Sequence, residues 1–181
     1  SKLSAEQKRL LGALAIYREA IPLEALAAQS LDTDELDSLV EQGLARQADA
    51  DSYDVHDLIR EFLHSGMEEE TAESLHKHAA DWYSNKLSSA ESIIEFLHHL
   101  IKCNQPEKAA DVVSQHGENL VRDGRMELLG ILEAIDLQSV AEAHACKVRI
   151  LQADILTLQG RFDEGESLYE EALKSSKTLK D

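Results

Sequence analysis

The sequence contains few of the residues that characterise sheet-rich, disulfide-bonded or membrane-spanning proteins. Aromatic residues make up 4% of its 181 residues, and it has two prolines and two cysteines. Leu, Ala, Glu and Asp prevail, which is typical of an all-α protein. Cys103 and Cys146 lie far apart in the chain, so we interpret them as reduced thiols. No apolar run approaches the ~18 residues that a membrane helix needs, and we expect a cytoplasmic protein with no membrane contact.

Basic side chains are also scarce. The 18 Lys and Arg residues stand against 35 Asp and Glu residues, and the formal net charge is −17. A surface of this charge repels nucleic acids and anionic lipids. The sequence also lacks the phosphate loop G-x-x-x-x-G-K-[ST] and the dinucleotide fingerprint G-x-G-x-x-G. The chain alone should therefore bind nucleotide weakly and hydrolyse none, and we expect neither catalytic residues nor a cofactor in it.

Two capping patterns mark the starts of helices in the first part of the chain. Ser4 and Gln7 have the spacing of a capping box, and the helix that follows has an apolar face. Asp32 and Glu35 have the same spacing before another short helix, which Gly43 should end. Between them, Pro22 suits the first turn of a helix over residues 23–29.

A β-hairpin should follow these three helices. Residues 44–48 and 53–56 alternate between apolar and polar side chains around the polar turn "DADS", and an amphipathic helix over residues 58–64 comes next. Three short helices and a hairpin are the layout of a winged helix-turn-helix. We therefore predict a winged-helix domain over residues 1–66.

The rest of the chain, residues 67–181, shows only helical periodicity. Short antiparallel helices with brief turns predict a helical solenoid, in which each pair buries its apolar face on the next. The boundaries around residues 117–124 stay undefined. The six amphipathic segments are residues 71–87, 89–103, 105–117, 125–135, 139–159 and 161–176.

The last two segments carry the most specific repeat signal. In "LTLQGRFDEGESLYEEAL", Gly160 lies at the turn, Phe162 follows it, and Gly165, Tyr169 and Ala172 lie on the second helix. This spacing resembles the tetratricopeptide (TPR) pattern, with Gly165 where the two helices approach closely. Because the chain begins without Met and ends on an uncapped repeat, we expect it to be part of a longer protein.

The stretch "VHDLIREFL" places His56 and Asp57 where the hairpin meets the next helix. An imidazole and the N–H groups of a helix start can converge there on an anion. The alternative is structural: Asp57 caps a helix that begins at Leu58, and His56 is the exposed end of a strand. The spacing alone leaves both interpretations open.

Three stretches together resemble the C-terminal regions of signal transduction ATPases with numerous domains (STAND), the class of NB-ARC proteins and MalT-type transcription regulators. "LLGALAIYREAIPLEAL" is similar to the start of their winged helix. "VHDLIREFL" is similar to their Met-His-Asp motif, with Val55 in place of Met. "LIKCNQPEKAADVVSQHGENLVRDGRMELLGILEAI" is similar to the helical linker before their repeats.

The resemblance implies a part of a signalling switch. His56 would contact the β-phosphate of ADP bound in an upstream nucleotide-binding domain of the parent chain, and Asp57 would be its structural partner. The helical repeats would bind a protein or small-molecule inducer. The parent protein would be an ATPase that uses ADP and ATP and forms an oligomer on activation.

Three other functions find little support in the residues. The third helix of the winged domain is acidic, and residues 1–64 hold six basic and 13 acidic side chains, so we expect no DNA binding. The paired histidines, His76 with His78 and His98 with His99, should point in different directions, and no metal motif occurs. No nucleophile elbow or acid–base pair indicates a hydrolase. A repeat scaffold that only binds a peptide remains the alternative.

Overall fold

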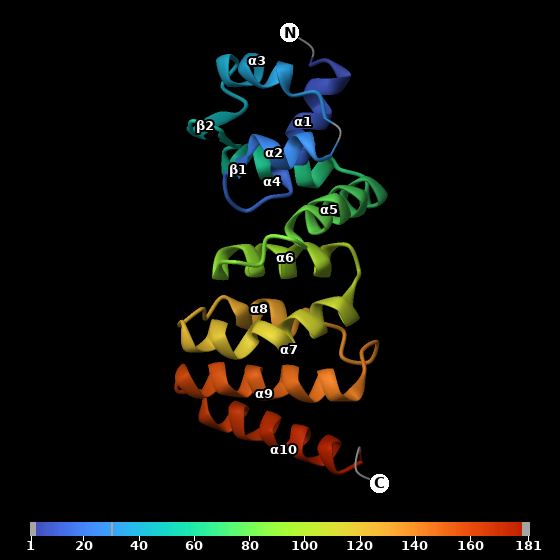
Figure 1. Cartoon of the computed structure of the whole chain (residues 1–181), viewed down its shortest axis with the longest axis vertical. Coiled ribbons are helices and arrows are strands. Elements are labelled where there is room, and N and C mark those ends of the chain that lie inside the picture. The colour runs from blue at the N-terminus through green and yellow to red at the C-terminus, as the bar shows by residue number, and fades with distance from the viewer. Residues whose placement is uncertain (1–2, 30, 179–181) are drawn as a thin grey trace. The chain divides into compact units, whose positions relative to one another are not determined.

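The computed structural model describes residues 3–29 and 31–178, and most of them are helical (Figure 1). The chain divides into two compact units, Ser1–Asn85 and Lys86–Asp181. The sequence placed a domain boundary after residue 66, and the two divisions differ in the assignment of one helix, α5 (Glu69–Tyr83). The predicted fold class is confirmed: a winged helix-turn-helix with a small sheet, followed by TPR-like helices.

The first unit has the element order of a winged helix-turn-helix, with one further helix at its end. Helices α1, α2 and α3 precede the hairpin of β2 and β3, and α4 follows directly. The bounds are α1 Ala5–Ala15, β1 Ile21–Pro22, α2 Leu23–Ala27, the 3-10 helix η1 Thr33–Glu35, α3 Leu36–Glu41, β2 Arg46–Asp49, β3 Ser52–Asp54, α4 Asp57–Gly66 and α5 Glu69–Tyr83.

Helix α1 is the central element of this unit's core. The predicted capping box is confirmed, because Ser4 Oγ accepts from the Gln7 N–H at 3.0 Å and Gln7 Oε1 accepts from the Ser4 N–H at 3.0 Å. Leu10, Leu11 and Leu14 are at most 1% exposed. Burial of each such side chain contributes roughly 1.5–3 kcal/mol relative to exposure.

The second predicted capping box is wrong. Asp32 does accept a hydrogen bond from the Asp34 N–H at 3.1 Å, but its own N–H donates to Glu6 Oε1 on α1 at 3.1 Å. Glu35, the expected partner, instead accepts from Gln7 Nε2 at 2.9 Å. The short helix is therefore tied to the start of α1 by long-range hydrogen bonds and is not closed locally.

The wing is a three-stranded antiparallel sheet in the order β1-β3-β2. Tyr53 is the central residue, opposite Ile21 on one side and Gln47 on the other. Pro22 lies in β1 with extended backbone and caps α2, one position earlier than the sequence suggested. Between Gln47 and Asp49 the register shifts, which twists the edge strand.

Helix α5 packs onto α1 inside the first unit. A Cβ atom built on Gly12 would lie 3.5 Å from Met67 Cε and 3.8 Å from Leu75 Cδ1, which are ordinary van der Waals distances, so α1 at Gly12 lies against α5 and the turn before it. At the other end of α5, the ring of Tyr83 lies 6.3 Å from the ring of Tyr17. These contacts are the physical reason that α5 belongs to the first compact unit.

The second unit is made of helices joined by short turns, as the periodicity predicted. Helix α7 continues through Arg122, so the segment that the sequence left undefined is helical up to that residue. A Cβ on Gly117 would lie 2.4 Å from Leu151 Cδ1, which shows how closely α7 and α9 pack. The bounds are α6 Ala90–Lys102, α7 Pro106–Arg122, α8 Leu128–Glu133, α9 Glu142–Leu158 and α10 Phe162–Thr178.

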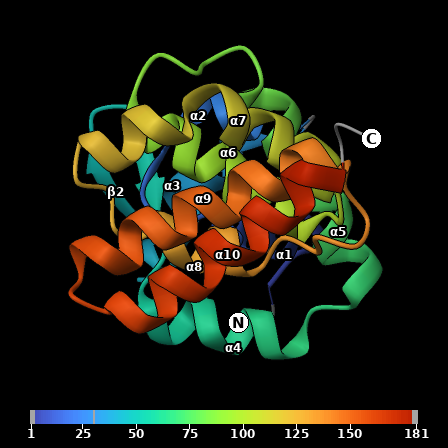
Figure 2. The same ribbon diagram turned by 90° about the horizontal axis from the view of Figure 1, so that it is seen from below.

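The last pair, α9 and α10, runs side by side as the TPR-like pattern predicted (Figure 2). Gly160 has φ +79° at the turn, a conformation that other residues rarely adopt. Gly165 lies against α9: a Cβ there would be 2.7 Å from Thr157 Oγ1 and 3.1 Å from the carbonyl oxygen of Ala153. Ala172 is 3% exposed on the same face.

In the part of the chain that the structure describes, no helix is long and apolar enough to cross a lipid bilayer.

We expect Gly165→Ala to destabilise the protein by about 1–3 kcal/mol, because the new methyl group would overlap with the Thr157 hydroxyl and crowd the carbonyl oxygen of Ala153 on α9. Gly130→Ala in α8 is the matched control, since no atom lies within 4 Å of its Cβ position. That substitution should stabilise the protein by about 0.5–1 kcal/mol through helix propensity alone. Urea unfolding followed by circular dichroism measures both changes, and equal effects would contradict the close approach at Gly165.

Candidate functional site

The predicted site lies where the wing meets α4. Strand β3 ends at Asp54, Val55 is fully buried, and His56 is the N-cap residue of α4, with φ −61° and ψ 145°. The carbonyl oxygen of His56 accepts from the N–H groups of Ile59 and Arg60, both at 2.9 Å. Its imidazole is exposed and makes no hydrogen bond to any residue that the structure describes.

A buried carboxylate holds this joint together. Asp54 has a side chain only 7% exposed; its Oδ2 accepts from Arg46 on β2 at 2.6 Å, and its Oδ1 accepts from Arg60 on α4 at 2.5 Å. The N–H of Val55 also donates to Asp54, at 2.7 Å. Burial alone would raise the pKa of this carboxyl, but the hydrogen bond from Arg46, that from Val55 and the two guanidinium charges together lower the pKa.

The structure places Asp57 at the first position of α4. Helix α4 begins at Asp57 and not at Leu58, so Asp57 does not cap the helix. Its carboxylate, 92% exposed, accepts from Arg60 at 2.8 Å. No hydrogen bond joins Asp57 to the His56 ring within the described residues. Arg60 therefore connects Asp57 to Asp54. The negative charge of Asp57 lies in the first turn of α4, where it interacts favourably with the helix dipole.

Helix α4 presents an apolar face to the surface. Leu58 is 80% exposed and Phe62, one helical turn further, is 76% exposed, so the two side chains lie on the same face. The other side of the helix contacts α1, where the imidazole Nε2 of His64 lies 3.0 Å from the carbonyl oxygen of Ala15. Two large exposed apolar residues beside an exposed imidazole are the surface pattern of a docking site.

The chemistry available at this joint is anion binding. The first N–H groups of a helix carry partial positive charge, and a neighbouring imidazole can donate a hydrogen bond to a phosphate oxygen. Nothing here supplies a nucleophile or an acid–base pair. The sequence placed His56 where the hairpin meets the helix, and the structure has it there, but the sequence gave no signal that Asp54 binds Arg46 and Arg60, because the three residues come from separate elements.

Helix α3 and the short helix before it present an acidic surface. Asp32, Asp34, Asp37 and Glu41 are all exposed. In a winged helix-turn-helix the third helix is the element that enters the major groove of DNA. Exposed carboxylates at this position repel the phosphate backbone.

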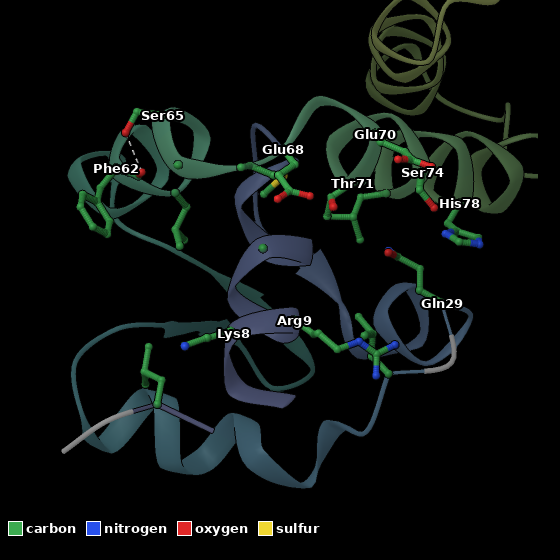
Figure 3. Close-up of a pocket in the computed structure, with 17 residues that line it drawn as sticks. Lys8, Arg9, Gln29, Phe62, Ser65, Glu68, Glu70, Thr71, Ser74 and His78 are labelled. Carbon is green, nitrogen blue, oxygen red and sulfur yellow. Dashed lines mark hydrogen bonds between the residues drawn. The ribbon is translucent and has the colours of Figure 1, made fainter. Parts of the chain in front are cut away.

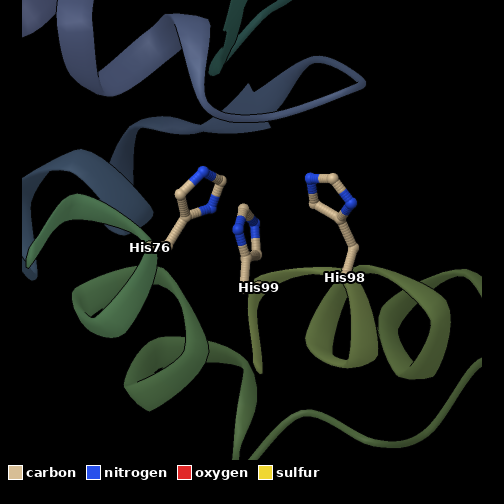
Figure 4. A group of neighbouring side chains, drawn as sticks. All are labelled: His76, His98 and His99. Atoms are coloured by element: carbon tan, nitrogen blue, oxygen red, sulfur yellow. The ribbon is translucent and has the colours of Figure 1, made fainter. Parts of the chain in front are cut away.

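The adjacent histidines on α6 were expected to diverge, and their rings instead meet edge to face. The ring centroids of His98 and His99 lie 5.3 Å apart at 67° (Figure 4). His99 is fully buried, and its Nε2 lies 4.0 Å from Glu95 Oε2, one helical turn earlier.

Comparison with known proteins gives one structural relative. No family model and no curated protein matches the chain. Among solved structures, the fold is similar to that of a STAND protein with a tetratricopeptide repeat sensor from Pyrococcus horikoshii, with a TM-score of 0.72 and 20% sequence identity. The match covers 94% of this chain and 26% of that protein, so the chain spans about a quarter of its relative's length. The fold expected from the sequence resemblance is thereby confirmed.

Replacing Asp54 tests whether it fixes the joint. We expect Asp54→Asn to lower the free energy of unfolding by about 2 kcal/mol at pH 7, because charged hydrogen bonds to two arginines are lost. Urea unfolding measures the loss. Asp57→Asn is the control and should cost less than about 1 kcal/mol, since its ion pair is exposed.

A comparison of the natural protein with Asp54→Asn at several pH values is a second test. The pKa of Asp54 is lower in the folded protein than in the unfolded chain, so its contribution is complete above the unfolded pKa of about 3.9 and disappears as pH falls through the folded pKa. The stability difference between the natural protein and Asp54→Asn should therefore shrink below about pH 4. A difference that persists unchanged to lower pH would contradict this role.

Proposed function

We propose that this chain is the regulatory and sensor part of a STAND-type ATPase switch that acts in the cytoplasm. The winged helix closes on a nucleotide-binding domain that precedes it in the parent protein. His56 donates a hydrogen bond to the β-phosphate of ADP in that domain, and the helical repeats bind an inducer or a partner protein. Binding at the repeats draws the winged helix away, and the parent protein becomes active and oligomeric.

One observation carries the nucleotide part of this proposal: the exposed imidazole of His56, the N-cap residue of α4, beside the buried Asp54 carboxylate that binds Arg46 and Arg60. A clamp of two arginines and a backbone N–H fixes the direction of the helix start. Because the start of α4 is fixed, the His56 ring and the positive end of the helix dipole can contact the same anion. The fold similarity to a STAND protein supports the assignment of that anion to a nucleotide.

The exposed apolar face of α4 supports the docking part. Leu58 and Phe62 lie on α4, whose N-cap residue is His56, so a protein surface that contacts His56 could also cover them. Burying two such side chains would contribute roughly 3–6 kcal/mol to closure. The winged helix would thus contact its own nucleotide-binding domain, and not DNA.

The free energy of switching requires both the hydrogen bond from His56 to phosphate and the apolar contacts of α4. Moving a two-state population from 1:99 to 99:1 takes about 5.5 kcal/mol of differential affinity. A charge-assisted hydrogen bond from histidine to phosphate supplies about 1.5–3 kcal/mol. The remainder has to come from contacts such as those of Leu58 and Phe62, which exist only in the closed state.

A second function, a TPR-like scaffold for protein–protein interaction without a nucleotide switch, is favoured by a different surface. Leu158 on α9 and Phe162 and Leu173 on α10 are 63%, 66% and 56% exposed. Exposed apolar side chains on a repeat array are typical of a protein-binding surface. The two functions differ in whether His56 affects a bound nucleotide.

Replacing His56 separates them. In the parent protein, His56→Ala should release ADP about tenfold or more faster, because a charge-assisted hydrogen bond to phosphate is lost. The variant should also form the active oligomer without inducer. ADP that co-purifies with the protein is measured by chromatography, and the oligomer by light scattering.

The matched control is His116→Ala on α7, which lies in the repeat region. It should retain ADP like the natural protein. Equal ADP retention in His56→Ala, or a parent sequence without a phosphate loop before Ser1, would leave the scaffold as the better interpretation.

The acidic third helix gives a prediction for DNA. The 181-residue chain should produce no mobility shift with duplex DNA at about 150 mM salt, because its net charge of −17 gives no release of counterions. Fluorescence anisotropy with a labelled duplex is an independent measurement. Saturable binding at this salt concentration would refute the assignment of the winged helix to protein contact.

A further inference from the structure

The first unit contains an open pocket whose lining includes Phe62 of the proposed docking face. It lies between α1, the end of α2, α4 and α5, and has a volume of about 940 Å³ (Figure 3). This volume is at the upper end of the range for small-molecule sites. Gly12, Leu63, Met67 and Leu75 give it an apolar wall. Because Gly12 has no side chain, the floor of the pocket at α1 stays open.

Gln29 supplies an unsatisfied polar group at this pocket. Its side chain is 8% exposed, and its Nε2 donates to the Tyr17 hydroxyl at 2.8 Å and to the Ala25 carbonyl at 3.3 Å. Because Nε2 faces a carbonyl acceptor, the orientation of the amide is fixed, and Oε1 is left as a buried acceptor with no partner among the described residues. Figure 3 shows this amide directed into the space between α1 and α5.

A buried acceptor without a donor is costly. Leaving such a group unpaired destabilises a protein by about 1–3 kcal/mol, and native proteins seldom retain one without a reason. A ligand that donates a hydrogen bond to Gln29 Oε1 would remove this cost. The acceptor therefore specifies one feature of the ligand, a hydroxyl or amide N–H group.

The basic residues at the pocket specify a second feature. Lys8 and Arg9 extend from α1 to opposite sides of it, and Arg9 lies on the same side as Gln29 (Figure 3). Arg9 is paired with Glu6 through Nη1 at 2.9 Å, which leaves its other donors available to a ligand. Glu68 and Glu70 line the opposite wall, and these two carboxylates and the two basic side chains are all exposed to solvent. An anionic group is therefore favoured only at the α1 side of the pocket, next to Arg9.

We propose that this pocket binds a small amphipathic anion that also carries a hydrogen-bond donor, such as a hydroxylated or N-acylated carboxylate. The apolar body packs against Leu63, Met67 and Leu75. The donor pairs with Gln29 Oε1, and the carboxylate pairs with Arg9. The site lies wholly within the first unit, and Phe62 is the one residue that it shares with the docking face of the switch proposed above.

Two probes that differ by one hydroxyl group test the donor. Decanoate and 3-hydroxydecanoate are titrated into the 181-residue chain below their critical micelle concentrations, and binding is measured by isothermal titration calorimetry. We expect each probe to bind at one saturable site. 3-Hydroxydecanoate should bind about threefold to tenfold more tightly than decanoate, because its hydroxyl group adds one hydrogen bond. In Gln29→Met, which has a similar shape and no acceptor, the two probes should bind equally.

Substitutions at α1 test the location of the site. Gly12→Leu should abolish binding of both probes, because its side chain would occupy the pocket, whereas Gly12→Ala should retain binding, since its Cβ makes only ordinary contacts. Arg9→Gln should weaken the binding of both probes about threefold or more. Lys77→Gln is the control and should leave binding unchanged, because Lys77 is exposed on α5 and does not line the pocket.

The outcomes are decisive in both directions. A difference between the probes that disappears in Gln29→Met establishes the donor contact. No saturable binding of either probe, or binding that Gly12→Leu leaves unchanged, overturns the proposal. If Gly12→Leu fails to fold, the test rests on Gln29→Met and Arg9→Gln. The proposed site is rejected if both variants bind the two probes with the affinities, and the preference for 3-hydroxydecanoate, of the natural protein.

Discussion

The joint between the wing and α4 depends on one buried carboxylate, that of Asp54, and its ion pairs with Arg46 and Arg60. Taking a carboxylate out of water is costly, and here two guanidinium groups and a backbone N–H offset that cost. Because Arg46 comes from β2 and Arg60 from α4, the same carboxylate fixes the wing and the direction of the following helix. The exposure of His56, and of the apolar face that follows it, results from this geometry.

The second unit is held together in a different way. Its helices approach closely at small residues, where Gly117 faces Leu151 and Gly165 faces Thr157. Close packing of this kind makes a repeat array stiff, so a contact at one end affects its neighbours. A stiff array suits the proposed role of the repeats, in which binding of an inducer has to move the winged helix.

The first unit combines a rigid joint with an open pocket. A ligand that fills the space between α1 and α5 would stabilise their packing, because it binds only to the folded arrangement. The proposed nucleotide contact lies at the start of α4, and the proposed ligand contacts lie toward the end of α4 and on α5. The unit thus offers two binding surfaces of different chemistry, one for phosphate and one for an amphipathic anion.

The sequence by itself determined the helices, the winged-helix order and the place of His56, because these depend on local periodicity, capping and turn residues. The Ser4–Gln7 capping box and the Gly160 turn are examples of such local signals. Only the tertiary structure decided the partners of polar groups: the backbone N–H of Asp32 donates to the carboxylate of Glu6 on a distant helix. Likewise, the unpaired acceptor of Gln29 follows from packing across several elements. Sequence spacing carries no information about such contacts, since the fold alone brings these residues together.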